Sequence, residues 1–160
     1  MRKVKKFKLT SEFIVDISGV KLFRIKALIE FGNVKAGDLG GYIEKEENLS
    51  HMGNAWVSGN AQVSGDARVS GNAQVFGDAR VSGDARVSGD KDYAYAHGFG
   101  SCNRTTTFFR LKDGDVGVRC GCFYGTLAQF RDKVCETHGE TKKAQEYLML
   151  ADLMEIRFKN

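Results

Sequence analysis

The centre of the chain alternates apolar and polar residues with a period of six. Each unit reads Val-Ser-Gly-Asn/Asp-Ala-x, and the units follow one another without a gap from Gly53 to Asp90. Two apolar columns recur along this stretch, a valine column and an alanine column: Val57, Val63, Val69, Val75, Val81 and Val87, and Ala55, Ala61, Ala67, Ala73, Ala79 and Ala85. A fixed short period dictates the architecture of such a segment.

A period of six fits neither a single helix at 3.6 residues per turn nor a simple alternating strand. Glycine tolerates the unusual backbone angles of a corner, and Asn or Asp is the next best residue for a left-handed position. Valine packs well on a pleated surface, and alanine is small enough for a tight interior. The pattern therefore predicts short strands separated by turns, with the valine and alanine columns pointing inward.

This unit resembles the hexapeptide repeat of the left-handed parallel β-helix, which uses three hexads per turn. The resemblance implies a mainly β fold in which residues eighteen apart stack on one another. The stacked columns would be Val57 with Val75 and Tyr93, Val63 with Val81 and Phe99, and Val69 with Val87. The alternative is a disordered Gly/Ser/Asp repeat, and the regular valines argue against it.

The segment before the repeat predicts a β-hairpin. Phe13 to Ile17 and Val20 to Leu28 are strand-like and meet at Ser18-Gly19, a short turn. We expect this hairpin to cap the first end of the β-helix, since a solenoid needs terminal caps. The basic residues between Arg2 and Lys8 indicate an edge strand whose lysines face solvent and deter aggregation, with an anion-binding arm as the alternative.

The link from the hairpin to the regular repeat is irregular. Ile43 and Leu49 are six residues apart, but Leu49 and Val57 are eight apart. We therefore expect an irregular first coil in which His51-Met52 is a two-residue excess at a corner.

The segment after the repeat predicts a C-terminal α+β element of one hairpin and two helices. Thr105 to Leu111 and Val116 to Phe123 are strand-like around a turn at residues 112–115. A capping box at Thr126 starts a helix that ends at His138-Gly139. A final helix from about Thr141 to Phe158 has an apolar arc widened by Leu150, Leu153 and Ile156, which predicts good burial. The predicted domains are a β cap at 1–42, the repeat at 43–99 and the α+β element at 100–160.

Composition and charge narrow the class of protein. The chain has 160 residues and a net charge of +4, which is too mild to favour a nucleic-acid partner. No apolar run approaches the roughly 20 residues of a membrane span. The four cysteines lack the density of a small disulfide-bonded domain and agree with a reducing compartment. We expect a soluble, cytoplasmic protein without a membrane partner.

The outward positions of the repeat supply candidate contact residues. Trp56 and Phe76 would share one face on adjacent coils, where they form either a partner interface or a contact with the protein's own terminal segments. Three arginines, Arg68, Arg80 and Arg86, are secondary polar contacts. An Asp stands two residues before each arginine, which predicts local neutralisation and a solvated surface.

Soft metal ligands occur in the C-terminal part. Cys102, Cys120, Cys122, Cys135 and His138 are enough ligands for one zinc site. The spacing is CxC rather than a paired CxxC, however, so buried structural thiols are the preferred interpretation and no metal is predicted. A nucleophilic pair of Cys122 and His138 lacks a third orienting group.

The β-helix resemblance also implies an enzyme alternative. Many hexapeptide-repeat proteins are acyltransferases that use acyl-CoA or an acyl carrier and a histidine base between the subunits of a trimer. Of His51, His97 and His138, His97 is the best candidate base because it follows the last regular coil. The repeat makes only about two coils, and no long loop leaves it to cover a pantetheine arm.

A second resemblance covers nearly the whole chain. FRIKALIEFGNVKAGDLGGYIEKEENLS, the hexads, and TTTFFRLKDGDVGVRCGCFYGTLAQFRDKVCETHG are similar to small hexapeptide-repeat proteins encoded by phages and prophages of Gram-positive bacteria. The resemblance implies a cofactor-free binding protein that acts in the host cytoplasm on a host protein, for example as an inhibitor of CRISPR defence. We expect a homo-oligomer, a dimer or trimer, because two coils have a thin core. The alternatives are the acyltransferase and a protein that sequesters a small anionic ligand such as a nucleotide signal.

Overall fold

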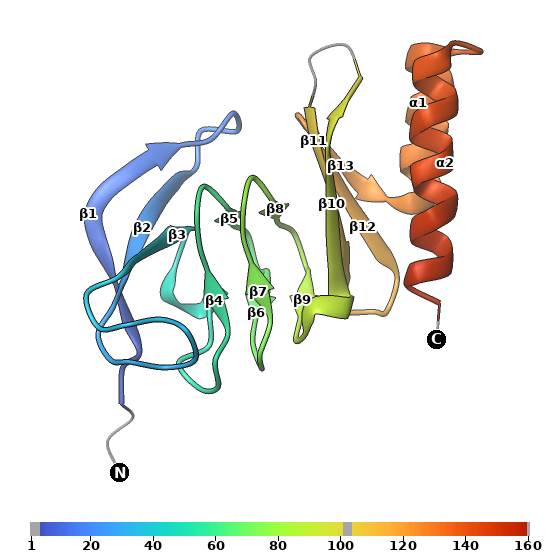
Figure 1. The fold of residues 1–160 in the computed structure, drawn as a ribbon. Helices are drawn as coiled ribbons and strands as arrows, with labels where there is room; N and C mark the ends of the chain where they lie inside the picture. Colours follow the sequence, from blue (N-terminus) through green and yellow to red (C-terminus); the bar gives the residue numbers. More distant parts are fainter. Residues whose placement is uncertain (1–3, 101–103, 160) are drawn as a thin grey trace.

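The computed structural model describes residues 4–100 and 104–159, and it is mainly β with two C-terminal helices. Three parts follow one another in Figure 1: an N-terminal hairpin, a stack of short strands, and an antiparallel sheet backed by two helices. We call the six short strands between residues 53 and 90 the repeat stack.

The N-terminal hairpin consists of β1 (Phe7–Val15) and β2 (Lys21–Ala27), which pair antiparallel as predicted. The Asp16 carboxylate accepts hydrogen bonds from the N–H groups of Ser18 and Val20 and fixes the turn. β2 pairs with β3 (Leu39–Ile43), and β1 is an edge of a five-stranded sheet. The strand order is β1-β2-β3-β5-β8, where β5 (Gln62–Val63) and β8 (Arg80–Val81) belong to the repeat stack.

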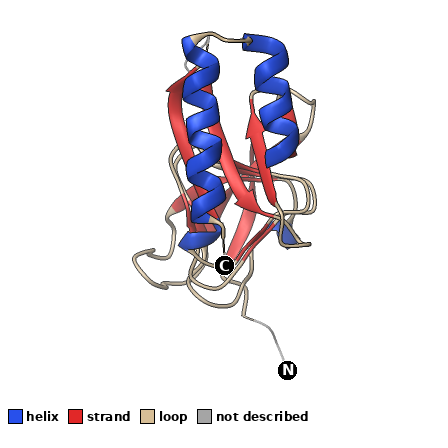
Figure 2. Cartoon of the chain, turned by 90° about the vertical axis from the view of Figure 1, so that its right-hand side faces the viewer, coloured by secondary structure: helices blue, strands red, loops and turns tan. Residues whose placement is uncertain are grey.

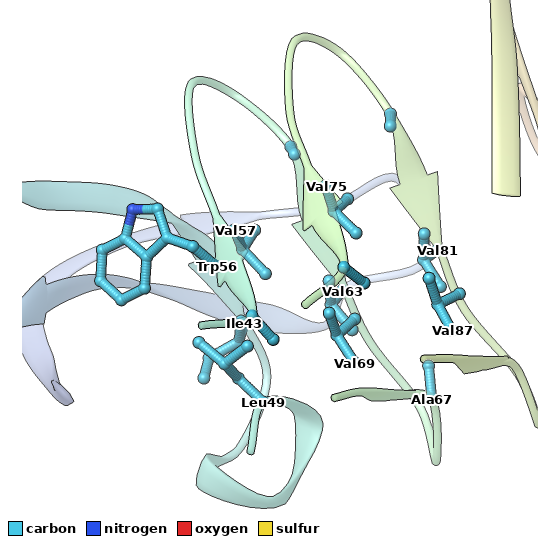
Figure 3. Close-up of a cluster of buried hydrophobic side chains, with 14 of the residues drawn as sticks. Ile43, Leu49, Trp56, Val57, Val63, Ala67, Val69, Val75, Val81 and Val87 are labelled. Carbon is cyan, nitrogen blue, oxygen red and sulfur yellow. The ribbon is translucent and has the colours of Figure 1, made fainter. Parts of the chain in front are cut away.

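The repeat stack pairs residues eighteen apart, as predicted. Its strands are β4 (Trp56–Val57), β5 (Gln62–Val63), β6 (Arg68–Val69), β7 (Gln74–Val75), β8 (Arg80–Val81) and β9 (Arg86–Val87). β4 pairs in parallel with β7, β5 with β8, and β6 with β9, so each valine lies opposite the valine eighteen residues later. All twelve column residues are at most 1% exposed, which confirms that the valines and alanines form the interior (Figure 3).

The first coil contains the predicted two-residue excess. Ile43 pairs with Val63 and Leu49 bridges Val69, so both pairs are twenty residues apart. The N–H of Ser50 donates to the Val69 carbonyl, and regular spacing resumes after residue 53. The excess therefore falls at residues 51–52, next to the short 3₁₀ helix η1 (Glu46–Asn48).

Two buried polar side chains, Lys6 and Asn48, bind backbone carbonyls at the first end of the repeat stack. Lys6 Nζ donates to the Ala55 carbonyl at 2.6 Å. Asn48 Nδ2 donates to the carbonyls of Gly65 and Ala67 at 3.1 and 2.9 Å. Farther along the stack the corresponding carbonyls accept backbone N–H groups of the preceding turn, so the two side chains replace missing donors. The prediction that the N-terminal lysines face solvent is thus wrong for Lys6, which is 1% exposed.

At the other end of the stack, side-chain oxygens accept hydrogen bonds from backbone N–H groups. The N–H of Gln74 donates to Asp90 Oδ1, and the N–H of Arg80 donates to Thr107 Oγ1, both at 2.9 Å. Asp90 lies in the 3₁₀ helix η2 (Asp90–Asp92), and Thr107 lies in the sheet that follows.

The C-terminal sheet has four antiparallel strands in chain order: β10 (Tyr93–Phe99), β11 (Arg104–Arg110), β12 (Val116–Cys120) and β13 (Phe123–Thr126). The turn at residues 112–115 is confirmed. The strand predicted to run from Val116 to Phe123 instead reverses at Gly121, whose φ is +59°, and this reversal creates β13.

Two helices cover one face of this sheet (Figure 2), namely α1 (Leu127–His138) and α2 (Lys142–Arg157). The capping box at Thr126 and the stop at Gly139 are confirmed. The predicted good burial of the final helix is wrong for two residues of its apolar arc, because Leu153 and Ile156 are 54% and 72% exposed.

The sheet also supplies the residues that meet the last valines. Tyr93 belongs to the core of the repeat stack, as predicted, and Phe109 from β11 joins it. Phe99 does not stack above Val81, because it packs against the second core beneath the helices. The exact domain boundaries stay predictions, although β10 already belongs to the C-terminal sheet.

Candidate anion-binding site

Six basic side chains surround one hollow of about 550 Å³ between the repeat stack, the β11–β12 turn and the end of α2. We call it the basic hollow, and its cations are Arg86, Lys91, Arg110, Lys112, Arg157 and Lys159. They come from β9, η2, β11, the following turn, and the end of α2 together with the residues just after it. Of the described residues that line the hollow, one is acidic, namely Asp92.

Neutral carbonyl groups hold two of the guanidinium groups in place. Arg86 Nη1 donates to the Asp66 carbonyl at 2.8 Å. Arg157 Nη2 donates to the carbonyls of Asp90 and Tyr93 at 3.0 and 3.2 Å. A carbonyl orients a guanidinium without cancelling its charge, so both side chains keep their positive charge available to an anion.

The third guanidinium, that of Arg110, is paired with Asp92. Arg110 Nε lies 3.2 Å from Asp92 Oδ1, and Asp92 Oδ2 accepts hydrogen bonds from the N–H and Oγ of Ser88. Burial of Asp92 favours its neutral form, but the hydrogen bonds from Ser88 and Arg110 outweigh burial and lower the pKa of its carboxyl. The hollow therefore contains one fixed carboxylate and a clear excess of positive charge.

The three lysines of the hollow are exposed, and none forms an ion pair within residues 4–100 and 104–159. Asp90 and Asp113, next to Lys91 and Lys112 in sequence, accept backbone N–H groups with their carboxylates and do not line the hollow. A concave surface of one sign concentrates the electrostatic potential and attracts counter-charge.

The arginine column of the repeat stack adjoins the basic hollow. Arg68 and Arg86 lie opposite each other on β6 and β9. Asp66, the aspartate predicted to neutralise Arg68, forms an ion pair with Lys45 at 2.8 Å. This hydrogen bond lowers the pKa of Asp66, and the charges of Arg86 and Arg68 lower it further. Asp66 thus lies in the field of both arginines, while its hydrogen bond goes to Lys45.

Arg80 and His97 come together in a separate groove of about 510 Å³, between the tips of the two hairpins. His97 is exposed, and its Nδ1 lies 2.7 Å from Thr105 Oγ1. In the described residues no carboxylate contacts the imidazole, so the geometry adds no orienting group to the acyltransferase alternative.

Trp56 and Phe76, the predicted interface pair, have different surroundings. Trp56 is 4% exposed, and its ring meets Phe31 edge-to-face at 5.2 Å. Figure 3 shows the Trp56 ring pointing away from the valines. The second interpretation, contact with the protein's own N-terminal segment, is therefore correct for Trp56, and its use as an interface residue is wrong. Phe76 is 51% exposed beside Tyr93 and Tyr95, and its interface role stays a prediction.

The candidate zinc ligands are only partly brought together. Cys120, Cys122 and His138 line one pocket of about 260 Å³, Cys135 is exposed outside it, and Cys102 lies outside the described residues. Among the residues described, no group of three or more His, Cys, Asp or Glu side chains is arranged to hold a metal ion. The predicted burial of the thiols is wrong for Cys122 and Cys135, which are exposed.

Cys120 and Tyr147, which line this pocket, form a polar cluster with the buried Thr106. Thr106 Oγ1 donates to Cys120 Sγ at 3.3 Å, and Tyr147 Oη lies 3.7 Å from the same sulfur. Burial and the neighbouring Cys120 raise the pKa of Tyr147 above its usual value. The phenol therefore stays neutral at physiological pH.

Comparison with known proteins defines the class of the central segment. A family model described as the YdcK beta solenoid repeat matches residues 61–77 and 73–89, which carry β5 to β9. The chain is thus a protein with a β-solenoid repeat. No curated protein matches it. Within the described residues, no helix is long and apolar enough to cross a membrane.

Proposed function

We propose that this chain is a non-enzymatic binding protein whose β-solenoid holds the basic hollow against an acidic segment of a host protein. The proposal is based on the convergence of six cations from five segments on one hollow. Among the described residues that line it, Asp92 is the one carboxylate, and it is already paired with Arg110. Because its three lysines are exposed and a lysine side chain is long and flexible, the hollow can adapt to carboxylates at several spacings.

The finer description of the scaffold is part of the proposal. The solenoid is a short left-handed parallel β-helix, and the N-terminal hairpin caps its first end with the help of Lys6 and Asn48. Its resemblance to phage and prophage hexapeptide-repeat proteins supports a role in the host cytoplasm as an oligomeric inhibitor of a defence complex such as CRISPR machinery.

An acidic protein fits the hollow better than a nucleic acid does. Proteins that bind single strands combine cations with aromatic side chains that stack on bases. Among the residues that the structure describes, none that lines the basic hollow is aromatic. The carboxylates of an acidic protein can bind through the cations alone, without aromatic side chains.

The proposal is tested by calorimetric titration with poly-L-glutamate. The variant Lys91→Gln/Lys112→Gln removes two exposed cations of the hollow, and Lys8→Gln/Lys35→Gln removes two exposed lysines at the opposite end of the molecule. We expect the first variant to weaken binding at least roughly tenfold and the second to leave it nearly unchanged. Binding should also weaken as salt is added.

Equal losses in both variants would show that net charge, rather than the hollow, attracts the probe. Tighter binding of oligothymidylate than of poly-L-glutamate with the same number of charges would contradict the acidic protein partner and favour nucleic acid.

The 260 Å³ pocket supports a second candidate, the sequestration of a small anionic ligand. Phe123, Phe130 and Tyr147 give it aromatic walls, and Arg104 and Lys133 add positive charge. Aromatic walls with a few charged groups are typical of small-molecule sites. A bound nucleotide would give purified protein excess absorbance at 260 nm and protect Cys122 from iodoacetamide. This candidate would be contradicted if purified protein lacked the excess absorbance and added GMP left the rate of Cys122 alkylation unchanged.

A further inference from the structure

Helix α2 presents an apolar stripe to solvent. Met149, Leu153 and Ile156 are 71%, 54% and 72% exposed. Their spacing of four and three residues places them on one face of the helix. The opposite face is buried against α1 and the sheet, and α2 belongs to the outermost layer of the molecule (Figures 1 and 2). Nothing in the described part of the chain covers the stripe.

We infer that the stripe is covered by α2 of a second copy, packed antiparallel, so that the protein is a two-fold homodimer. This inference rests on the oligomer in the proposed function and names its surface. A two-fold interface uses the same patch on both chains, so the patch must be complementary to itself.

Glu146 on α2 and Lys159, two residues beyond its end, meet this requirement only in the antiparallel orientation. When Met149 lies opposite Ile156 of the second copy, the same register places Glu146 opposite Lys159 at both ends of the stripe. A parallel copy would place each charged residue opposite its own twin. Glu146 and Lys159 form no ion pair within the described residues of one chain, so both are available across the interface.

The acidic side chains beside the stripe are compatible with the same arrangement. Asp152 and Glu155 flank the stripe and are already paired with Arg131, at 2.9 and 3.3 Å. They therefore add little repulsion between the copies.

The dimer would also arrange the basic hollows. Each hollow lies at the C-terminal end of its own α2, and a helix of 16 residues is about 24 Å long. An antiparallel pair thus separates the two hollows to opposite ends, and a partner with two acidic segments would gain from binding both.

The first test is the mass in solution, by light scattering after gel filtration. Wild type should have twice the chain mass of 17.7 kDa, and Leu153→Glu should have the mass of one chain with an unchanged circular dichroism spectrum. Met52→Glu is the matched control, since Met52 is 79% exposed in the first coil, away from α2. It should stay dimeric. A monomeric wild type, or a dimeric Leu153→Glu, would overturn the inference.

A charge swap tests the orientation. Glu146→Lys and Lys159→Glu should each raise the dimer dissociation constant several-fold, and the double variant should restore it. A double variant whose dimer dissociation constant stays as high as that of the single variants would overturn the antiparallel register. Poly-L-glutamate binding separates the two proposals, because a monomeric wild type that still binds the probe through Lys91 and Lys112 would contradict the dimer and leave the basic hollow supported.

Discussion

At the scale of single residues, Asn48 and Lys6 show how a short solenoid can begin. The first turn of a parallel stack has no preceding turn to donate N–H groups to its carbonyls, and buried carbonyls without donors are costly. Asn48 is fully buried and donates to two carbonyls, while its Oδ1 accepts from the N–H groups of Glu44 and Lys45. We expect both side chains to act as structural caps rather than as ligands.

Asn48→Ala should lower the free energy of unfolding by about 3 kcal/mol, because it leaves two buried carbonyls without donors. Denaturation in urea measures the change. Asn60→Ala at an exposed corner is the control and should stay within about 0.5 kcal/mol of wild type. Similar costs for the two variants would contradict the capping role.

Lys6 should make stability depend on pH in the alkaline range. Burial lowers the pKa of Lys6 from 10.5 to about 8, so between these values the unfolded chain binds the proton more strongly than the folded chain does. The free energy of unfolding should therefore rise as pH increases from about 8 to 10.5. Lys6→Met should lose this rise in urea denaturation across the same range. An identical pH profile in both proteins would refute the assignment.

At the scale of elements, backbone conformation and packing explain why each hexad has a glycine at its corner. Gly71 has a φ of +62°, and a Cβ built there would lie 2.3 Å from the Ser88 carbonyl oxygen in the next turn of the repeat. Gly19 in the β1–β2 turn also has a positive φ, but a Cβ there would meet nothing within 4 Å. The positive φ favours glycine at both positions. At Gly71, unlike Gly19, the backbone of the next turn also leaves no room for a Cβ atom.

Gly71→Ala should therefore destabilise the protein by about 2 kcal/mol more than Gly19→Ala does. The two variants share the conformational penalty, so thermal or urea denaturation of the pair isolates the close approach between turns. Equal effects would mean that the turns separate easily at this corner.

The elements that the sequence predicts well are those with local signals. The six-residue period places every inward valine, and the capping box at Thr126 places the start of α1. The predictions that were wrong concern residues whose positions depend on tertiary contacts. Phe99 continues the six-residue spacing, but it lies outside the repeat stack because β10 pairs with β11. Trp56 is buried because the loop that contains Phe31 covers it.

At the scale of the whole molecule, the basic hollow exists only after folding. Arg86 and Lys159 are more than seventy positions apart, and Lys112 lies in a turn that looks solvated on its own. Of the six cations only Arg86 is a candidate in the sequence, and there the neighbouring Asp84 predicts neutralisation. Asp84 does not line the hollow, and Arg86 is oriented by the Asp66 carbonyl, a contact that has no local signal.

The measurement that most directly tests binding at the basic hollow is a backbone amide NMR titration with poly-L-glutamate. The account predicts chemical-shift changes at residues 86–92, 110–114 and 157–159, which lose amplitude in Lys91→Gln/Lys112→Gln. Changes centred instead on the 260 Å³ pocket, at residues 120–123 and 133–138, or no changes at all, would contradict it.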